Sequence, residues 1–497
     1  MSEHKSLTTV VVVGRDTDLW LCVNSLWRAL RPAGVQVTAI ELPTRLSPSH
    51  ISASLPPLEA LHTQLRIEES ALLRLTGGSF SLGQSFVSQA PGFFHAWAAH
   101  GAPIEGSHFF PCWLRATRHG FNMPLRSFCL TAVAAQNGRM LIPDEATAAF
   151  GRADYGYHFQ TWAYVSYLKS LAASLGVECY QAREVAVERA LDGSIAALVI
   201  DGASRIAGQL FVDASGADAI LIGRALQVPC ESWSEHFNVD RALAAHAPAF
   251  TSIPPFAEVR PSRTGWTLLH PSLAATGVVH AYCSDLLSDD AALEAASTVV
   301  GAKLGDASCH AVNPYVRARV WEGNCVAVGE AACRLDPIHD VGLHVAQLSI
   351  VHLLSLFPNC MAVATERAEY NRVMRSHYER IRDFQCLYYA LSASDGEFWR
   401  RARAVRIPDS LAHKLATFRA CGHVPPMEDE TFPVESWQAL LVGLGIIPES
   451  VSPAVDRISL SRYNEEFGRM LGFIKTKVLE QPTHDSYLRN LVRAEVA

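Results

Sequence analysis

The sequence predicts an α/β fold, and three features near its start carry that prediction. An apolar run at residues 10–13 has the character of a buried strand and ends at Gly14. Apolar residues at helical spacing follow over 19–30, and a second apolar strand at 35–40 ends on Glu41. A strand, a helix and a second strand in this order form the unit from which dinucleotide-binding sheets of the Rossmann type are built.

Composition and charge narrow the classes of protein that fit this chain. Its 497 residues are 49% hydrophobic and 18% charged with a net charge of −7, which suits one elaborate α/β domain with a helical portion, or two to three domains. The mild acidity gives no indication of nucleic acid or an anionic membrane as a partner. No apolar run reaches the roughly 18 residues of a spanning helix, and the N-terminus lacks the pattern of a signal peptide. We therefore expect a cytoplasmic protein.

The cysteines and histidines do not indicate a metal site. The 12 cysteines are scattered without a Cys-x-x-Cys pair, which fits reduced, buried thiols. Four histidines, His95, His100, His108 and His119, fall in one segment but lack the spacing of metal ligands. We expect no bound metal.

The pattern along the chain divides it into a long α/β part and a helical end. Residues 46–150 are rich in Gly, Pro, Ser and aromatic residues with poor periodicity, as in insertions that build substrate cavities. Further strand patterns at 255–285 fall in a second insertion, at about 225–310. We predict an α/β domain over 1–360 that carries these insertions, and a mostly helical portion over 361–497.

Further elements complete the α/β pattern. Periodicity and turn residues predict a helix, three strands with an Asp-Gly hairpin turn between the first two, a last buried strand and a long helix. In chain order these lie at 161–175, 183–190, 195–200, 209–213, 325–328 and 342–357.

The turn after the first strand departs from the dinucleotide-binding pattern. It should be rich in glycine, because glycines let the backbone approach a pyrophosphate that rests on the helix N-terminus. Here the turn reads Gly-Arg-Asp-Thr-Asp-Leu over 14–19, with one glycine and two carboxylates. A Thr and an Asp before an apolar run also form an ordinary helix N-cap, so the turn alone does not separate the two interpretations.

Several separated segments together resemble the flavin-dependent tryptophan halogenases, which are FAD enzymes of the flavin monooxygenase class. They match the family's Asp-Cys-Ser-Gly segment, its second FAD motif, its Glu-Pro-Leu-Glu-(Ser/Ala)-Thr-Gly-Ile motif and its C-terminal helices. In chain order the segments are Asp213–Gly216, Val326–Ala332, Asp336–Leu343, Tyr370–Arg372, Tyr378–Phe384 and Phe398–Trp399.

This resemblance implies a Rossmann-like FAD-binding fold with a substrate-cavity insertion and a helical C-terminal portion. It also implies FAD as cofactor, an aromatic small molecule as substrate, a flavin reductase as partner and a homodimer. The cofactor-binding positions that it implies are Gly14, Glu41, Asp213, Gly216, Gly329, Glu330, Gly342 and Leu343.

The departures from the family fall on the residues that carry its chemistry. The family's lysine in Thr-Phe-Lys-Leu-Gly, which activates hypohalous acid, aligns with Ser81, and its catalytic glutamate aligns with His339. In Trp-x-Trp-x-Ile-Pro, Leu268 and His270 replace the second Trp and the Ile. A serine hydroxyl cannot do the work of the ammonium group, whereas a neutral histidine can still act as a base.

The altered phosphate turn also bears on the cofactor. Two carboxylates within about 5 Å of a pyrophosphate would each repel it by roughly 1–3 kcal/mol, and side chains in place of glycines add a steric penalty. Arg15 could offset part of this by pairing with a phosphate. We therefore predict that FAD binding is weak or lost, although the remaining motif residues fit either residual flavin binding or a retained fold.

Two functions follow as hypotheses. The first is a pseudoenzyme that works as a partner of an active flavin enzyme, such as a flavin reductase or a halogenase paralogue, or a small-molecule binder. The alternative is an active FAD-dependent halogenase or monooxygenase that acts on an indole or another aromatic substrate with altered cofactor binding. A hydrolase built from Ser81, His339 and Asp340 lacks the Gly-x-Ser-x-Gly motif.

Overall fold

The computed structural model describes residues 6–87, 92–360 and 362–493, which group into two compact units. Unit 1 and unit 2 are each assembled from three separate stretches of the chain. Unit 1 comprises Met1–Thr76, Phe159–Ser234 and Val312–Glu379, and unit 2 comprises Gly77–His158, Glu235–Ala311 and Arg380–Ala497. The division into residues 1–360 and 361–497 describes the sequence pattern and stays a prediction.

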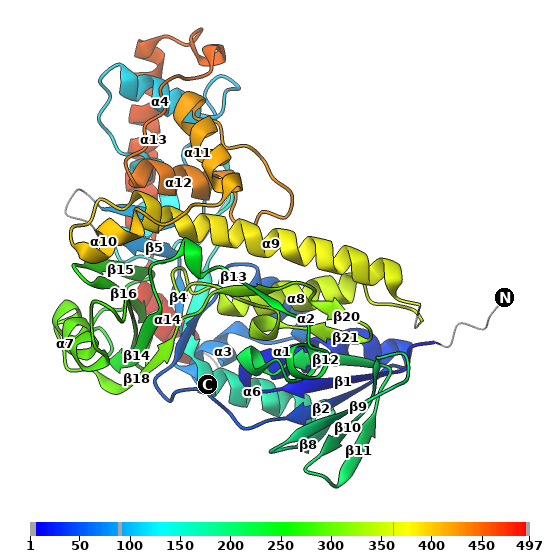
Figure 1. Ribbon diagram of the computed structural model, residues 1–497. Helices are drawn as coiled ribbons and strands as arrows, with labels where there is room; N and C mark the ends of the chain where they lie inside the picture. Colours follow the sequence, from blue (N-terminus) through cyan, green and yellow to red (C-terminus); the bar gives the residue numbers. More distant parts are fainter. Residues whose placement is uncertain (1–5, 88–91, 361, 494–497) are drawn as a thin grey trace. The chain divides into compact units, whose positions relative to one another are not determined.

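Unit 1 contains a six-stranded sheet whose centre is the predicted strand–helix–strand unit (Figure 1). β1 (Thr9–Gly14) pairs in parallel with β2 (Gln36–Glu41) on one side and with β12 (Leu210–Ala214) on the other, and α1 (Asp16–Leu30) connects β1 to β2. The sheet continues outward through β21 (Cys325–Ala327), β20 (Trp321–Glu322) and β8 (Glu178–Gln181). The α/β fold is therefore confirmed.

Helices cover α1, and a small antiparallel sheet extends from the unit. α6 (Thr161–Ser174) and α8 (Gly342–Ser355) both contact α1, and they confirm the helices predicted at 161–175 and 342–357. β9 (Val185–Arg189), β10 (Ile195–Ile200) and β11 (Ser204–Ala207) form a three-stranded sheet, with the predicted hairpin turn between β9 and β10. The remaining elements of unit 1 are α2 (Leu58–Leu65), α3 (Glu69–Thr76), β13 (Cys230–Ser232), β19 (Tyr315–Arg317) and β22 (Cys333–Arg334).

Unit 2 contains a seven-stranded sheet in the order β18-β14-β17-β16-β15-β5-β6. The strands predicted at 255–285 are confirmed as part of this sheet, and α7 (Asp289–Val300) packs over it around a core that includes Leu243, Val278 and Ala296. The strands are β5 (Gly83–Phe86), β6 (Phe93–Ala96), β14 (Arg241–Ala247), β15 (Ala257–Ser262), β16 (Gly265–Pro271), β17 (Thr276–Tyr282) and β18 (Gly305–Ala311).

The helices of unit 2 come from both the first insertion and the chain end, and several lie together in Figure 1. They confirm that the chain beyond residue 364 is mostly helical, and α9 begins there in unit 1 and continues into unit 2. The helices are α4 (Phe109–Arg118), α5 (Leu130–Gln136), α9 (Ala364–Leu391), α10 (Glu397–Ala402), α11 (Asp409–Cys421), α12 (Val434–Gly443), α13 (Leu460–Glu480) and α14 (His484–Arg493).

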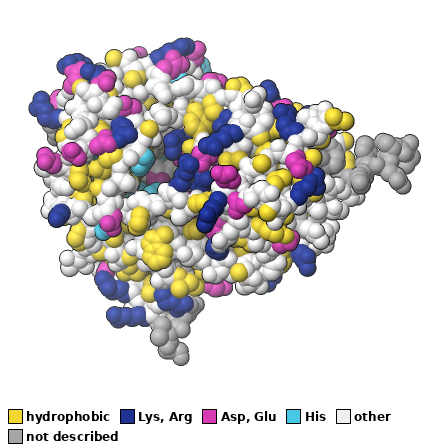
Figure 2. Space-filling view, turned by 60° about the horizontal axis from the view of Figure 1, so that its bottom comes forward, with side chains coloured by type: hydrophobic (Ala, Val, Ile, Leu, Met, Phe, Trp, Pro, Cys, Tyr) yellow, Lys and Arg dark blue, Asp and Glu magenta, His cyan; other side chains and the backbone are white. Residues whose placement is uncertain are grey.

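Helix length, metal-ligating groups and surface charge can be stated for the described residues. In the described ranges no helix combines the length and the apolar character needed to cross a membrane. Among the same residues, no group of three or more His, Cys, Asp or Glu could hold a metal ion. Figure 2 shows Lys and Arg side chains mixed with Asp and Glu on one face of the molecule, so this face carries no single-sign patch.

Candidate functional site

The edge of the unit 1 sheet where β1 and β12 end gathers most of the predicted cofactor-binding residues. Gly14 is the last residue of β1 and lies opposite Ala214 at the end of β12. A Cβ atom at Gly14 would lie 2.3 Å from the carbonyl oxygen of Ala214, which is far inside van der Waals contact. The sheet itself therefore requires glycine at this position, whether or not a phosphate binds there.

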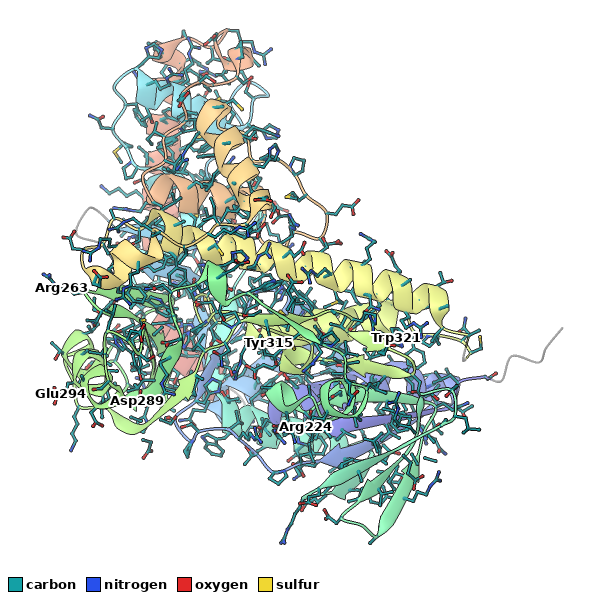
Figure 3. The ribbon with its side chains drawn as sticks, in the orientation of Figure 1. Arg224, Arg263, Asp289, Glu294, Tyr315 and Trp321 are labelled. Carbon is teal, nitrogen blue, oxygen red and sulfur yellow. The ribbon has the colours of Figure 1, made fainter. Side chains whose placement is uncertain are left out.

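Arg15 pairs with a carboxylate from the neighbouring strand end. Its Nη1 lies 2.5 Å from Oδ2 of Asp218, in η4 (Gly216–Asp218), and 3.1 Å from the Ser215 carbonyl oxygen. Arg45 lies 2.7 Å from the same carboxylate oxygen, and Arg224 of η5 (Ile220–Ala225, labelled in Figure 3) lies 2.7 Å from the other. Burial raises the pKa of Asp218, but the three guanidinium groups outweigh it and lower that pKa overall. The Arg15 guanidinium group is thus already paired with the Asp218 carboxylate.

The two aspartates of the turn are also engaged by the protein. Asp16 has a φ of +56°, and its carboxylate accepts a hydrogen bond from the Arg45 backbone N–H at 3.1 Å. The carboxyl of Asp18 lies against Gly329, where an added Cβ would be 2.1 Å from Oδ2, and it accepts a hydrogen bond from the backbone N–H of Glu330. Its enclosed position raises the pKa of Asp18 to about 8, and the carboxylates of Glu330 and Asp16 add to this.

This pKa predicts a pH-dependent effect of Asp18→Asn on stability. Because the folded state binds the proton more tightly than the unfolded state, the wild-type protein loses stability as the pH rises from about 4 to about 8. We expect Asp18→Asn to be more stable than wild type by about 1–3 kcal/mol at pH 8, with the difference vanishing near pH 4. Thermal melts of both proteins across this pH range measure it. Asp16→Asn, which keeps an acceptor for Arg45, is the matched control, and equal melting temperatures of Asp18→Asn and wild type at pH 8 would contradict the expectation.

Two of the acidic residues predicted to bind the cofactor, Glu41 and Glu330, are held by basic partners within unit 1. Glu41 accepts hydrogen bonds from Lys169 Nζ at 2.6 Å, from Trp20 Nε1 at 3.3 Å and from Gln181 Nε2 at 3.4 Å. Glu330, in η7 (Gly329–Ala331), pairs with Arg334, whose Nε lies 3.1 Å from its carboxylate. These contacts give each carboxylate a structural role that does not depend on a bound cofactor.

Asp213 acts as a cap within the sheet edge. Its fully buried carboxylate accepts four hydrogen bonds: from the backbone N–H groups of Ser215, Leu221 and Ile222 at 3.1, 2.7 and 2.8 Å, and from the Ser215 hydroxyl at 2.5 Å. Burial raises the pKa of Asp213 although these hydrogen bonds favour the charged form. This carboxylate thus fixes the start of η5.

The remaining cofactor-binding positions lie at element starts in unit 1. Gly216 begins η4 with a φ of +67°, and Gly329 begins η7 with a φ of +61°, so both occupy conformations that favour glycine. Gly342 and Leu343 are the first residues of α8. Their backbone N–H groups belong to the unpaired first turn of that helix.

His339 lies in the loop before α8. It is 1% exposed, and burial lowers its pKa to about 3, so the imidazole is neutral at pH 7. His339 and Asp340 have φ values of +69° and +45°, which are unusual for residues other than glycine. The carboxylate of Asp340 accepts a hydrogen bond from the Ala53 N–H at 2.8 Å, and burial raises the pKa of Asp340 to about 7. The sequence pattern did not predict this backbone strain.

Ser81 lies in unit 2, whereas His339 lies in unit 1. It ends β4 (Ser79–Ser81), is 3% exposed, and donates a hydrogen bond to the Gly83 carbonyl oxygen at 3.3 Å. The next residue, Leu82, accepts a hydrogen bond from the backbone N–H of Trp97. Ser81 thus supplies a neutral hydroxyl, bonded locally, at the position where the sequence resemblance predicts that a lysine is replaced.

An aromatic cluster packs close to this strand. The fully buried His95 of β6 lies 4.7 Å from Trp97, 5.5 Å from Phe384 and 6.0 Å from Phe432, measured between ring centroids. Phe384 and Phe432 stack at 3.8 Å. The two tryptophan-motif positions are also buried, since Leu268 and His270 are 0% exposed in β16.

Comparison with known proteins shows where this architecture occurs. The family model for tryptophan halogenase matches residues 9–459. The chain belongs to the tryptophan halogenase family. Its relatives include tryptophan 7-halogenase KtzQ from Kutzneria sp. (strain 744), which is 25% identical with 98% of this chain and 99% of KtzQ covered. Tryptophan 7-halogenase RebH from Lentzea aerocolonigenes is 23% identical, with 94% and 95% covered.

Solved structures agree with the family assignment. BrvH, a flavin-dependent halogenase from Brevundimonas sp. BAL3, superposes with a TM-score of 0.92 at 28% identity and covers 98% of this halogenase-family chain and 99% of BrvH. Xcc4156, a flavin-dependent halogenase from Xanthomonas campestris, gives 0.92 at 29% identity with the same coverage. The predicted Rossmann-like FAD-binding fold is thereby confirmed.

Membership of the halogenase family implies FAD as cofactor. The question is whether the residues of the phosphate turn leave room and hydrogen-bond donors for the FAD pyrophosphate. A glycine-rich turn offers bare backbone to a pyrophosphate, but here the Asp18 carboxyl lies over Gly329 and Arg15 is paired with Asp218. The Asp18 carboxyl, whose pKa is raised to about 8, would lose its proton only at further cost beside a phosphate, and a charge on Asp16 would repel that phosphate. The turn residues, as they are placed, do not fit a pyrophosphate.

Proposed function

We propose that this protein keeps the fold of a tryptophan halogenase without lysine-dependent halogenation, holds FAD weakly or not at all, and acts by binding an aromatic small molecule. The observation that carries the proposal is the occupation of the phosphate turn by the protein's own side chains. Asp18 against Gly329 and the Arg15–Asp218 ion pair both take space and donors that a pyrophosphate would need.

The positions that correspond to the catalytic residues support the same conclusion. Ser81 has no ammonium group with which to hold or polarise hypohalous acid, and its hydroxyl already donates to Gly83. His339 is neutral at pH 7 because of its burial, so it can accept a proton only at considerable cost. Substitution of both positions removes the two groups on which family chemistry depends.

The retained motif residues do not oppose this proposal, because each has a contact within the fold that explains it. Gly14 is required by the approach of Ala214, Asp213 caps η5, and Glu41 is held by Lys169. The presence of these residues is therefore explained without a bound flavin.

A halogenation assay tests the proposal. The purified protein is incubated with FAD, an NADH-dependent flavin reductase, bromide and tryptophan, with a tryptophan halogenase as positive control, and the products are analysed by mass spectrometry. We expect no halogenated product from the wild type. A halogenated indole formed by the wild-type protein in proportion to its concentration would overturn the proposal.

Restoring the lysine alone should not restore activity. Ser81→Lys supplies the missing ammonium group but leaves Asp16, Asp18 and the Arg15–Asp218 pair in the phosphate turn. We therefore expect Ser81→Lys to yield no more halogenated product than wild type in the same assay. Product formed by Ser81→Lys but not by Ser81→Met, a variant of similar length without the charge, would show that the turn does not prevent cofactor use.

An active FAD-dependent halogenase or monooxygenase is the second candidate. It is favoured by the relatives, which are named as halogenases and match nearly the whole chain. In that case the same assay gives a halogenated or hydroxylated aromatic product that requires FAD and the reductase.

A further inference from the structure

A cavity of about 540 Å³ lies within unit 2, between α4, the segment that follows it, β6 and the end of α12. Its volume falls in the range of sites for small organic ligands, roughly 300–1,000 Å³. None of the residues that line it is among the motif positions described above. The cavity is therefore separate from the residues that match the family's cofactor and catalytic motifs.

The walls of this cavity are aromatic and held in place by other contacts. Phe93 stacks on Phe86 with centroids 4.6 Å apart and an interplanar angle of 6°. It also lies on α12, where a Cβ at Gly443 would be 2.3 Å from its ring. Trp113 donates from Nε1 to the Met123 carbonyl oxygen at 2.9 Å. These contacts keep the aromatic surfaces in position before any ligand binds, which reduces the ordering that binding requires.

Two polar side chains interrupt the aromatic lining. His100 is 7% exposed, and among the described residues its buried Nδ1 has no hydrogen-bond partner. That nitrogen is enclosed by the protein, whereas the other ring nitrogen, Nε2, is not enclosed and bonds to no described residue, so it is the one that can pair with a ligand or water. Burial lowers the pKa of His100 to about 4, so the ring is neutral and accepts from one nitrogen while it donates from the other.

The second polar side chain, Arg126, carries a permanent positive charge. Its Nη1 donates to the Gly92 carbonyl oxygen, and that contact uses only part of a guanidinium group with five N–H donors. The remaining donors suit a carboxylate, which guanidinium binds with a charge-assisted hydrogen bond. Arg126 is partly exposed, so a carboxylate there would lie at the mouth of the cavity.

We propose that this cavity binds a small aromatic carboxylate that carries a hydroxyl group, with the ring between Phe93 and Trp113, the hydroxyl on His100 and the carboxylate on Arg126. The inference rests on the proposal that the chain acts by binding, and it names the site and the ligand class. Failure of this inference can be told apart from failure of the proposed function. The halogenation assay measures product, whereas this inference is tested by ligand binding at His100 and Arg126.

The test uses three probes and two variants in a titration followed by calorimetry. The probes are 4-hydroxyphenylacetate, phenylacetate, which lacks the hydroxyl, and 4-methylphenol, which lacks the carboxylate. In wild type we expect 4-hydroxyphenylacetate to bind about five- to tenfold tighter than phenylacetate and at least about tenfold tighter than 4-methylphenol. His100→Leu should abolish the preference over phenylacetate, because it removes the group that binds the hydroxyl. Arg126→Met should abolish the preference over 4-methylphenol, because it removes the group that binds the carboxylate.

Matched variants and folding controls make the result decisive. His119→Leu and Arg118→Met change exposed residues at the end of α4 that do not line the cavity, and they should leave all three affinities unchanged. Melting temperatures establish that His100→Leu and Arg126→Met fold.

The proposal is overturned by undetectable binding of 4-hydroxyphenylacetate to wild type, or by probe preferences that persist in both folded cavity variants. It is also overturned if the exposed Met123 and Ile447 beside the cavity mediate self-association that Met123→Asp abolishes, since the face is then an interface between copies.

Discussion

Asp213→Ala is expected to lower the free energy of unfolding by about 3–5 kcal/mol, although the sequence resemblance predicts a cofactor-binding role for Asp213. The substitution leaves three backbone N–H groups without their acceptor: that of Ser215, just after β12, and those of Leu221 and Ile222 at the start of η5. Each unsatisfied buried donor costs about 1–3 kcal/mol, and relaxation of η5 recovers part of that loss. Chemical denaturation followed by circular dichroism measures the change.

Asp213→Asn separates this capping role from a role of the charge. The Asn side chain has a single acceptor oxygen. Depending on its orientation, that oxygen accepts either from the Leu221 and Ile222 N–H groups or from Ser215, but not from both sets. We expect it to be intermediate, with a loss of about 1–2 kcal/mol. Stability of Asp213→Ala within about 0.5 kcal/mol of wild type would show that the residue is not a structural cap.

Gly14→Ala is expected to destabilise the protein by about 3 kcal/mol, without any ligand being involved. The added methyl group would lie 2.3 Å from the Ala214 carbonyl oxygen, and both strands are central in the sheet, so neither backbone can move away easily. The loss is measured by chemical denaturation in the absence of FAD.

Gly468→Ala is the matched control for this glycine. Gly468 lies inside α13, with no atom within 4 Å of an added Cβ, so alanine should stabilise the protein by about 0.5–1 kcal/mol through its higher helix propensity. If Gly14→Ala were as stable as wild type but altered flavin binding, the glycine would serve the cofactor and not the sheet.

The first sheet and its helix could be predicted closely from the sequence, because their signal is local. The apolar run at 10–13 and the helical periodicity after it correspond to β1 and α1 within a few residues. The first insertion was different. Residues 46–150 contain strands that pair with distant partners, such as β5 with β15, and short helices whose burial is decided by tertiary packing. Periodicity over a short window does not carry that information.

The sequence resemblance predicts which residues belong to the candidate site, but it does not predict their contacts. The family resemblance located Ser81, His339 and the altered turn, whereas the role of Asp218 as the partner of Arg15 depends on β12 lying beside β1. Opposite charges just beyond two strands of one parallel sheet are a signal that could have suggested this pair. The positive φ values at His339 and Asp340 have no such signal, because they follow from the packing of the loop.

The affinity of the wild-type protein for FAD decides whether the residues of the phosphate turn exclude the cofactor. Purified protein is titrated with oxidised and with reduced FAD, and binding is followed by flavin fluorescence, or by equilibrium dialysis for the reduced form. Arg15→Gly/Asp16→Gly/Asp18→Ala, which removes the long and acidic side chains from the turn, is titrated in parallel after its melting temperature has shown that it folds. We expect no saturation of wild type at about 100 µM FAD and a gain in affinity of at least about tenfold in the variant. A wild-type dissociation constant near 1 µM, unchanged or weakened by clearing the turn, would contradict it.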